Sequence, residues 1–158
     1  MYWVSIDGEL VPSEDAKISV WDHGYLYGDG LFETMRSYGG QVFALKEHLD
    51  RLHRGAETLR LAIAYPDQVL EQFILATLRK NELLDAYIRL TYSRGPGPIG
   101  LDPALCPKGT LVIMVKPMEV PEHLYREGMS VGICPIRRNP AEALPPELKS
   151  QNFLNNIL

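Results

Sequence analysis

Apolar and polar residues alternate along several short stretches of the chain, as in half-buried β-strands. The first two pairs of stretches flank Asp7-Gly8 and Gly39-Gly40, which are dipeptides typical of tight hairpin turns. We expect strands at residues 2–6, 9–11, 31–38, 41–44, 86–93, 110–116 and 129–136. The first four should form two β-hairpins.

Two longer stretches repeat their apolar residues every three to four positions, which predicts amphipathic helices. The first runs from Leu45 to Ile63. The second begins near Pro66, because proline suits a first helical turn, and continues to Leu78. A further apolar helix should open at Ser150 or its neighbour. Helices and strands mix without strict alternation, so we predict an α+β fold.

Composition narrows the class of protein. The chain has 158 residues, of which 46% are hydrophobic and 23% charged, so it is long enough to bury a core. A net charge of −4 argues against a nucleic-acid surface. The apolar run at 111–115 is too short to cross a membrane, and residues 1–10 lack the pattern of a signal peptide. We therefore expect a cytoplasmic protein that binds neither nucleic acid nor membrane.

Neither the cysteines nor the histidines predict a metal site. Cys106 and Cys134 stand alone, without the spacing of a zinc site, and we interpret them as unpaired thiols. His48 and His53 are five residues apart, which misses the spacing of helical zinc ligands. The run GPGPIG at 95–100 fits a dinucleotide-binding pattern, but its prolines remove N–H donors, so we expect only a loop.

Arg51 and Lys149 are the first candidates for chemistry. Arg51 lies one turn into the first predicted helix, and a guanidinium binds a phosphate through two parallel hydrogen bonds. The alternative is a solvated helix face on which the charged residues pair with one another. Lys149 lies between a proline-rich loop and an apolar segment, and burial or cationic neighbours make a lysine amine nucleophilic. The alternative for Lys149 is an ordinary surface lysine.

Tyr87 and Arg89 form a second candidate group. Alternation places both side chains on one face of the strand at 86–93, where a phenol and a guanidinium can bind a carboxylate. An exposed sheet face explains the same pattern equally well.

Four sequence blocks, in this order and spacing, resemble the class IV (fold type IV) pyridoxal-phosphate enzymes. These are DHGYLYGDGLFE, HLDRL, YIR and LKSQNFLNN, and the similarity extends over residues 1–158. That group includes branched-chain aminotransferases, D-amino acid aminotransferases and aminodeoxychorismate lyases. The resemblance implies pyridoxal 5'-phosphate as cofactor, with Lys149 as the lysine that binds it covalently and Arg51 as the ligand of its phosphate.

The resemblance also implies a substrate pocket. Tyr27, Phe32 and Arg36 match pocket-lining positions, and Tyr87 and Arg89 match a pair that branched-chain aminotransferases place near the substrate carboxylate. The expected activity is transfer of an amino group between a branched-chain L-amino acid and 2-oxoglutarate, in a homodimer or higher homo-oligomer. The alternatives are a 4-amino-4-deoxychorismate lyase, a D-amino acid aminotransferase, or a non-catalytic partner domain.

The chain departs from the branched-chain pattern at two positions and from the D-amino acid aminotransferase pattern at two others. Phe153 stands where those enzymes usually have a tyrosine, and Thr34 replaces the glycine of their FEG motif. Ile99 and Leu101 replace the basic loop residues of D-amino acid aminotransferases.

The resemblance also divides the chain. We expect a small N-terminal domain at 1–116, a linker at 117–128 and the start of a cofactor-binding domain at 129–158. We interpret the chain as a piece of a longer family member, and expect residues 1–158 alone not to transaminate.

Overall fold

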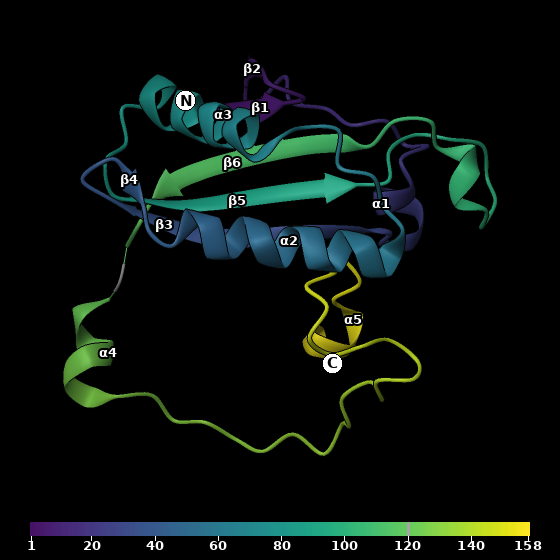
Figure 1. The fold of residues 1–158 in the computed structure, drawn as a ribbon. Helices are drawn as coiled ribbons and strands as arrows, with labels where there is room; N and C mark the ends of the chain where they lie inside the picture. Colours follow the sequence, from purple (N-terminus) through teal and green to yellow (C-terminus); the bar gives the residue numbers. More distant parts are fainter. Residues whose placement is uncertain (120) are drawn as a thin grey trace.

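A six-stranded antiparallel sheet forms the centre of the protein (Figure 1). The computed structural model describes residues 1–119 and 121–158. In chain order the strands are β1 (Trp3–Ile6), β2 (Glu9–Pro12), β3 (Gly30–Tyr38), β4 (Gln41–Val42), β5 (Ala86–Ser93) and β6 (Thr110–Pro117). Their spatial order is β2-β1-β6-β5-β3-β4, and each neighbouring pair is antiparallel. The sheet and its helices confirm the α+β fold.

Two long helices pack on one face of this sheet. They are α2 (Leu45–Leu59) and α3 (Asp67–Lys80), and their buried leucines and isoleucine join those of the central strands in one core. Shorter helical turns are α1 (His23–Tyr27), η1 (Pro103–Leu105), α4 (Glu122–Glu127) and α5 (Leu154–Ile157). No helix in residues 1–119 and 121–158 is long and apolar enough to span a membrane.

The opposite face of the sheet lies away from these helices. Met35 pairs in register with Ile88, and Ile88 with Val115, and all three belong to the core. Because side chains alternate between faces, the neighbouring residues of each strand point to the uncovered face. The predicted pocket residues of β3 and β5 all lie there.

The chain after β6 leaves the sheet and returns to the edge of β3. Figure 1 shows residues 121–147 running below α2 before they turn back toward the sheet. Ser150 forms a β-bridge with Leu31, while Phe32 N–H donates to the Lys149 carbonyl at 3.0 Å and Gln151 N–H donates to the Gly30 carbonyl at 2.8 Å. Lys149 is thereby held against the first residues of β3.

Several predicted elements differ from the structure. The helix predicted to reach Ile63 ends at Leu59, where Arg60 takes a left-handed conformation, and the strand predicted at 41–44 is limited to Gln41–Val42. The strand expected at 129–136 is wrong: those residues are irregular, and Met129, Val131 and Ile133 are exposed. Alternation specifies an apolar face but not a pairing strand, and the described residues offer none. The helix expected from Ser150 is a single turn, α5, because Ser150 itself pairs with β3.

Candidate functional site

The site begins where Lys149 meets β3. Within the described part of the chain β4 pairs only with Ser37 and Tyr38 of β3, so the edge of β3 near Phe32 is open to residues 149–151. Leu148 is buried in the core and fixes the segment from the other side. The Lys149 amine then lies 4.5 Å from the ring centroid of Phe32. The backbone thus places a lysine amine over the uncovered face of the sheet.

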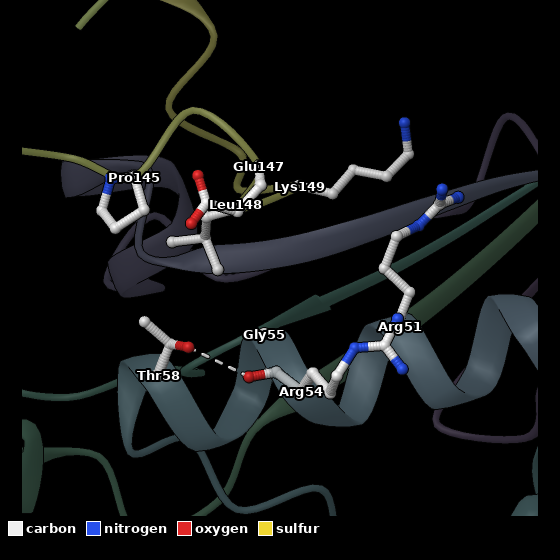
Figure 2. A pocket seen from close by; sticks show the side chains of 8 residues that line it. All are labelled: Arg51, Arg54, Gly55, Thr58, Pro145, Glu147, Leu148 and Lys149. Atoms are coloured by element: carbon white, nitrogen blue, oxygen red, sulfur yellow. Dashed lines mark hydrogen bonds between the residues drawn. The ribbon is translucent and has the colours of Figure 1, made fainter. Parts of the chain in front are cut away.

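A cavity of about 300 Å³ separates α2 from the loop that leads to Lys149. Its lining residues are Arg51, Arg54, Gly55, Thr58, Pro145, Glu147, Leu148 and Lys149. Figure 2 shows Arg51 and Arg54 coming from α2 on one side and Lys149 coming from the loop on the other. Three cationic side chains and one carboxylate line the cavity, so its charge favours an anionic ligand.

Arg51 is oriented by a buried carboxylate. Its Nε donates to Glu33 Oε1 and its Nη2 donates to Glu33 Oε2, both at 2.6 Å. The Glu33 side chain is 1% exposed, whereas that of Arg51 is 45% exposed. Glu33 is therefore inside the core, while Arg51 lies at the cavity. Nη1 of Arg51 makes no hydrogen bond within the described residues.

His48 completes this group. Its Nδ1 lies 2.8 Å from Glu33 Oε2 and 3.2 Å from Arg51 Nη2. Burial of Glu33 raises the pKa of its carboxyl, but the hydrogen bonds and charges of Arg51 and His48 outweigh this effect and lower the pKa below its usual value. An ionised carboxylate only accepts hydrogen bonds, so the contact is one in which His48 Nδ1–H donates a hydrogen bond to Glu33 Oε2.

Three side chains contact the ring of Phe32 on the uncovered face of the sheet. The Arg89 guanidinium carbon lies 3.9 Å from its ring centroid, on the same ring that the Lys149 amine approaches. The ring of Phe153 packs edge-on against it, with centroids 5.2 Å apart. Cations attract the faces of aromatic rings, so Phe32 holds two basic side chains close together although they repel each other.

Tyr87 lies beside Arg89 on the same face. Its hydroxyl is 3.5 Å from Thr34 Oγ1, and the Lys116 amine lies 5.2 Å from its ring centroid. The Thr34 hydrogen bond lowers the pKa of the Tyr87 phenol, burial opposes this, and the nearby Arg89 and Lys116 charges lower the pKa further. The surroundings of the phenol therefore favour negative charge.

The remaining two predicted residues lie further from Lys149. Arg36 lies four residues after Phe32 on β3 and points to the same face of the sheet. Its guanidinium carbon is 4.4 Å from the ring centroid of Tyr38. Tyr27 ends α1, and its hydroxyl accepts a hydrogen bond from Gly100 N–H at 3.2 Å. The structure thus brings Phe32, Arg89 and Lys149 together, while Tyr27 contacts the loop at 95–100.

That loop is held by α1 and by the residue that precedes its N-cap. Gly97 N–H donates to the Trp21 carbonyl at 3.1 Å, and His23 Nε2 lies 3.0 Å from the Pro98 carbonyl oxygen. A side chain at Gly97 would collide with the Leu105 carbonyl oxygen, so the tight path of the loop explains this glycine.

Three site residues were not identified from the sequence: Glu33, His48 and Lys116. Alternation along residues 31–38 places Glu33 on the buried face, where a carboxylate requires a partner. His48 and Arg51 are three residues apart on one helix face, which supplies two candidate partners. The sequence pattern does not indicate Lys116, because its position beside Tyr87 depends on the register in which β6 pairs with β5.

Comparison with known proteins identifies relatives along the whole chain. The family model for amino-transferase class IV matches residues 30–158. A putative branched-chain-amino-acid aminotransferase of Methanocaldococcus jannaschii is 45% identical over 155 residues, covering 98% of this chain and 53% of the relative. A D-alanine aminotransferase of Staphylococcus epidermidis is 33% identical over 98% of this chain and 54% of its own length. An aminodeoxychorismate lyase of Bacillus subtilis is 33% identical over 98% and 52%.

Solved structures give the same result. The branched-chain amino acid aminotransferase of Escherichia coli superposes with a TM-score of 0.92 at 27% identity, over 99% of this chain and 54% of that protein. The T.th. branched-chain amino acid aminotransferase, complexed with N-(5'-phosphopyridoxyl)-L-glutamate, gives a TM-score of 0.89 at 28% identity, over 99% and 52%. The chain therefore spans about half the length of the relatives that it matches.

Proposed function

This chain belongs to the class IV aminotransferase family, and from that premise we propose that it provides Lys149 and Arg51 to a pyridoxal 5'-phosphate-dependent transaminase. The proposed reaction moves an amino group between a branched-chain L-amino acid and 2-oxoglutarate. The likeness to the relative from M. jannaschii and to the two solved branched-chain enzymes supports this choice of substrate.

The residues on either side of the cavity fit this cofactor. A phosphate dianion requires cationic donors, and Arg51 and Arg54 line the cavity with Nη1 of Arg51 uncommitted in the described part of the chain. An aldehyde requires an amine, and Lys149 borders the same cavity. Glu147 is the opposing carboxylate, and it leaves the lining with an excess of positive charge.

When bound, pyridoxal 5'-phosphate supplies an aldehyde for covalent attachment and a ring that withdraws electrons from the substrate α-carbon. Lys149 Nζ would form the covalent bond to that aldehyde with loss of water. Once the substrate amine displaces it, the freed Lys149 amine would accept the proton of the substrate α-carbon and deliver it to the cofactor. Arg51 fixes the phosphate, and Glu33 fixes Arg51, which restricts the position of the reacting atoms. Arg89 binds the substrate carboxylate, with the Tyr87 hydroxyl beside it.

The placement of Lys149 is the observation that carries the proposal. Its amine is held over the ring of Phe32, which the Arg89 guanidinium also contacts. The same lysine lines a cavity with an excess of positive charge. The backbone pairing of residues 149–151 with β3 makes this placement a feature of the fold.

Covalent labelling tests the assignment. The full-length protein is mixed with pyridoxal 5'-phosphate, reduced with borohydride, digested and analysed by mass spectrometry. The modified peptide should contain Lys149, and Lys149→Ala should abolish the label and the production of glutamate from leucine and 2-oxoglutarate. Lys108→Ala is the matched control, because that lysine pairs with Asp7 on another part of the surface. A label on another lysine of the native protein contradicts the proposal.

A 4-amino-4-deoxychorismate lyase is the second candidate. Phe153, whose ring carries no hydroxyl, packs against Phe32, and Thr34 forms a hydrogen bond with the Tyr87 hydroxyl. Both Phe153 and Thr34 depart from the branched-chain pattern. The relative from B. subtilis supports it as well. Release of pyruvate from aminodeoxychorismate, without glutamate formation from leucine and 2-oxoglutarate, would favour the lyase.

The wider organisation belongs to the same proposal. Residues 1–116 would form the small domain, 117–128 the linker and 129–158 the start of the cofactor domain. We also propose a cytoplasmic homodimer. The exposed apolar side chains of Leu154, Ile157 and Leu158 require cover, either from a further part of the protein or from a partner subunit. Light scattering of the full-length protein tests the dimer.

A further inference from the structure

The irregular segment that leads to Lys149 is tied to α5 by side chains. Asn155 of α5 uses both ends of its amide: Oδ1 accepts a hydrogen bond from Asn139 N–H at 3.2 Å, and Nδ2 donates to the Arg137 carbonyl at 3.0 Å. One side chain thus pairs two backbone groups of the segment, as a residue of a neighbouring strand would. Residues 140–154 therefore form a loop that is closed at its base and contains Lys149.

Arg138 strengthens this connection from the middle of the paired segment. Its Nη1 donates to Asn156 Oδ1 at 2.7 Å and to Asn155 Oδ1 at 3.0 Å, and its Nη2 donates to the Pro146 carbonyl at 3.4 Å. A guanidinium holds its donors in one rigid plane, so this side chain fixes the three acceptors relative to one another. Arg138 therefore joins α5, which follows Lys149 in the chain, to Pro146, which precedes it.

Pro146 belongs to the wall of the cavity that faces α2. It lies within residues 145–149, of which four line the cavity opposite Arg51. The inner side of this wall is anchored by apolar packing, because Leu144 packs against the core and Leu148 is part of it. Between these two leucines, the Pro146 carbonyl is held from outside by the guanidinium of Arg138.

We propose that Arg138 is a positioning residue for the cofactor, which fixes the cavity wall at 145–147 opposite Arg51. This inference rests on the proposed function, in which the cavity holds pyridoxal 5'-phosphate between Arg51 and Lys149. Arg138 is not among the described residues that line the cavity, so it acts through the wall. A ligand between two elements binds more tightly when both are already ordered, since less conformational freedom is lost on binding. Glu33 orders Arg51 on the α2 side, and Arg138 orders the wall on the other.

Arg137 provides a matched comparison in the same segment. Both arginines are exposed and carry the same charge. The Arg137 side chain makes no hydrogen bond or ion pair within residues 1–119 and 121–158, and only its carbonyl is used, by Asn155. Substitution of either arginine by methionine removes one positive charge near α5, but only the substitution of Arg138 removes the contact with Pro146.

Calorimetric titration of the full-length protein with pyridoxamine 5'-phosphate tests the positioning role. This probe carries the phosphate but has an amine in place of the aldehyde, so it cannot bind Lys149 covalently. Arg138→Met should weaken its binding about tenfold, because the wall must then be ordered on binding, whereas Arg137→Met should stay within about twofold. Arg138→Lys keeps a charged donor for Asn156 and should recover part of the loss.

Hydrogen–deuterium exchange of the ligand-free protein separates positioning from general destabilisation. In Arg138→Met the amides of Asn139 and Leu148, which bond within the loop, should exchange several-fold faster than in the native protein. The Gln151 amide, which donates to the Gly30 carbonyl of β3, should keep its native rate, and the urea midpoint should not move.

Native affinity for pyridoxamine 5'-phosphate in Arg138→Met overturns the positioning role, even where pyridoxal 5'-phosphate attaches to Lys149. An equal loss in Arg137→Met also overturns it, because charge alone would then explain the effect, and so does a loss that accompanies a lower urea midpoint. Attachment at Lys149 is followed separately by borohydride labelling. A label on another lysine, with affinity for pyridoxamine 5'-phosphate still dependent on Arg138, contradicts the proposed function and leaves the role of Arg138 standing.

Discussion

Glu33 binds the guanidinium of Arg51 through both of its carboxylate oxygens, each at 2.6 Å. The acid belongs to β3 and the base to α2, so the pair joins the strand that carries Phe32 to the helix that lines the cavity. A planar guanidinium held at two nitrogens has little freedom to rotate. The direction in which Arg51 offers its remaining N–H groups is therefore set by a residue that no ligand reaches.

Glu33→Gln should lower the free energy of unfolding by about 2 kcal/mol, because it replaces a buried charge-assisted pair by weaker neutral hydrogen bonds. Urea unfolding of the full-length protein at neutral pH measures the difference. Asp50→Asn is the control, since Asp50 pairs with Lys46 on the helix surface, where solvent screens the pair, and its loss should lower the free energy of unfolding far less. Equal effects of the two substitutions would show that the buried Glu33–Arg51 pair contributes no more to the free energy of unfolding than a surface pair.

The pair also predicts a dependence of stability on pH. The pKa of Glu33 in the folded protein is below its ordinary value of 4.5, so folding favours the ionised carboxyl. This contribution is fully present above about pH 4.5 and is lost as the pH falls through the lower, folded pKa. The stability of the native protein should therefore fall more steeply than that of Glu33→Gln below about pH 4.5. Parallel curves in acid urea titrations would contradict this assignment.

Arg51→Lys tests the phosphate contact while keeping a positive charge beside Glu33. A lysine lacks the forked donors, so affinity for pyridoxal 5'-phosphate should fall about tenfold, while affinity for pyridoxal, which has no phosphate, should stay within about twofold. Equilibrium titration of cofactor absorbance measures both. Arg60→Lys, beyond the end of α2, should change neither affinity. A parallel loss for both ligands would place Arg51 outside the phosphate site.

The hairpins and long helices were predictable because their signals are local. Asp7, Gly8, Gly39 and Gly40 all have positive φ, between 51° and 90°, which is the conformation that their turns require. The strand at 129–136 was wrongly predicted, since alternation indicates a half-buried face and says nothing about a partner strand.

The site was predictable in part. The resemblance selected Lys149 and Arg51, and the structure places both at one cavity. The Glu33 partnership depends on how closely α2 approaches β3, which is a tertiary property. The position of Lys116 beside Tyr87 depends on the registry of two strands separated by a loop. Neither relationship leaves a periodic signal in the sequence.

Gly55 allows α2 to approach the segment that carries Lys149. A Cβ atom there would lie 3.1 Å from both terminal methyl carbons of Leu31 and 3.3 Å from Leu148 Cδ1. Gly55→Val adds further methyl groups at this contact, and overpacking costs about 1–3 kcal/mol. Because Leu148 immediately precedes Lys149, the displacement should also reduce the fraction of protein that attaches pyridoxal 5'-phosphate.

Gly132→Val is the matched control for this substitution, since no atom of residues 1–119 and 121–158 lies within 4 Å of a Cβ built there. Gly55→Ala separates folding from attachment: alanine improves helix propensity by about 1 kcal/mol, which offsets the tighter contact. This variant should therefore keep the native stability within about 1 kcal/mol while still attaching less cofactor than the native protein. Thermal unfolding and borohydride labelling of all three variants measure the two effects. Full labelling of Gly55→Val at native stability would show that the position of Lys149 does not depend on the packing of Leu148 against α2.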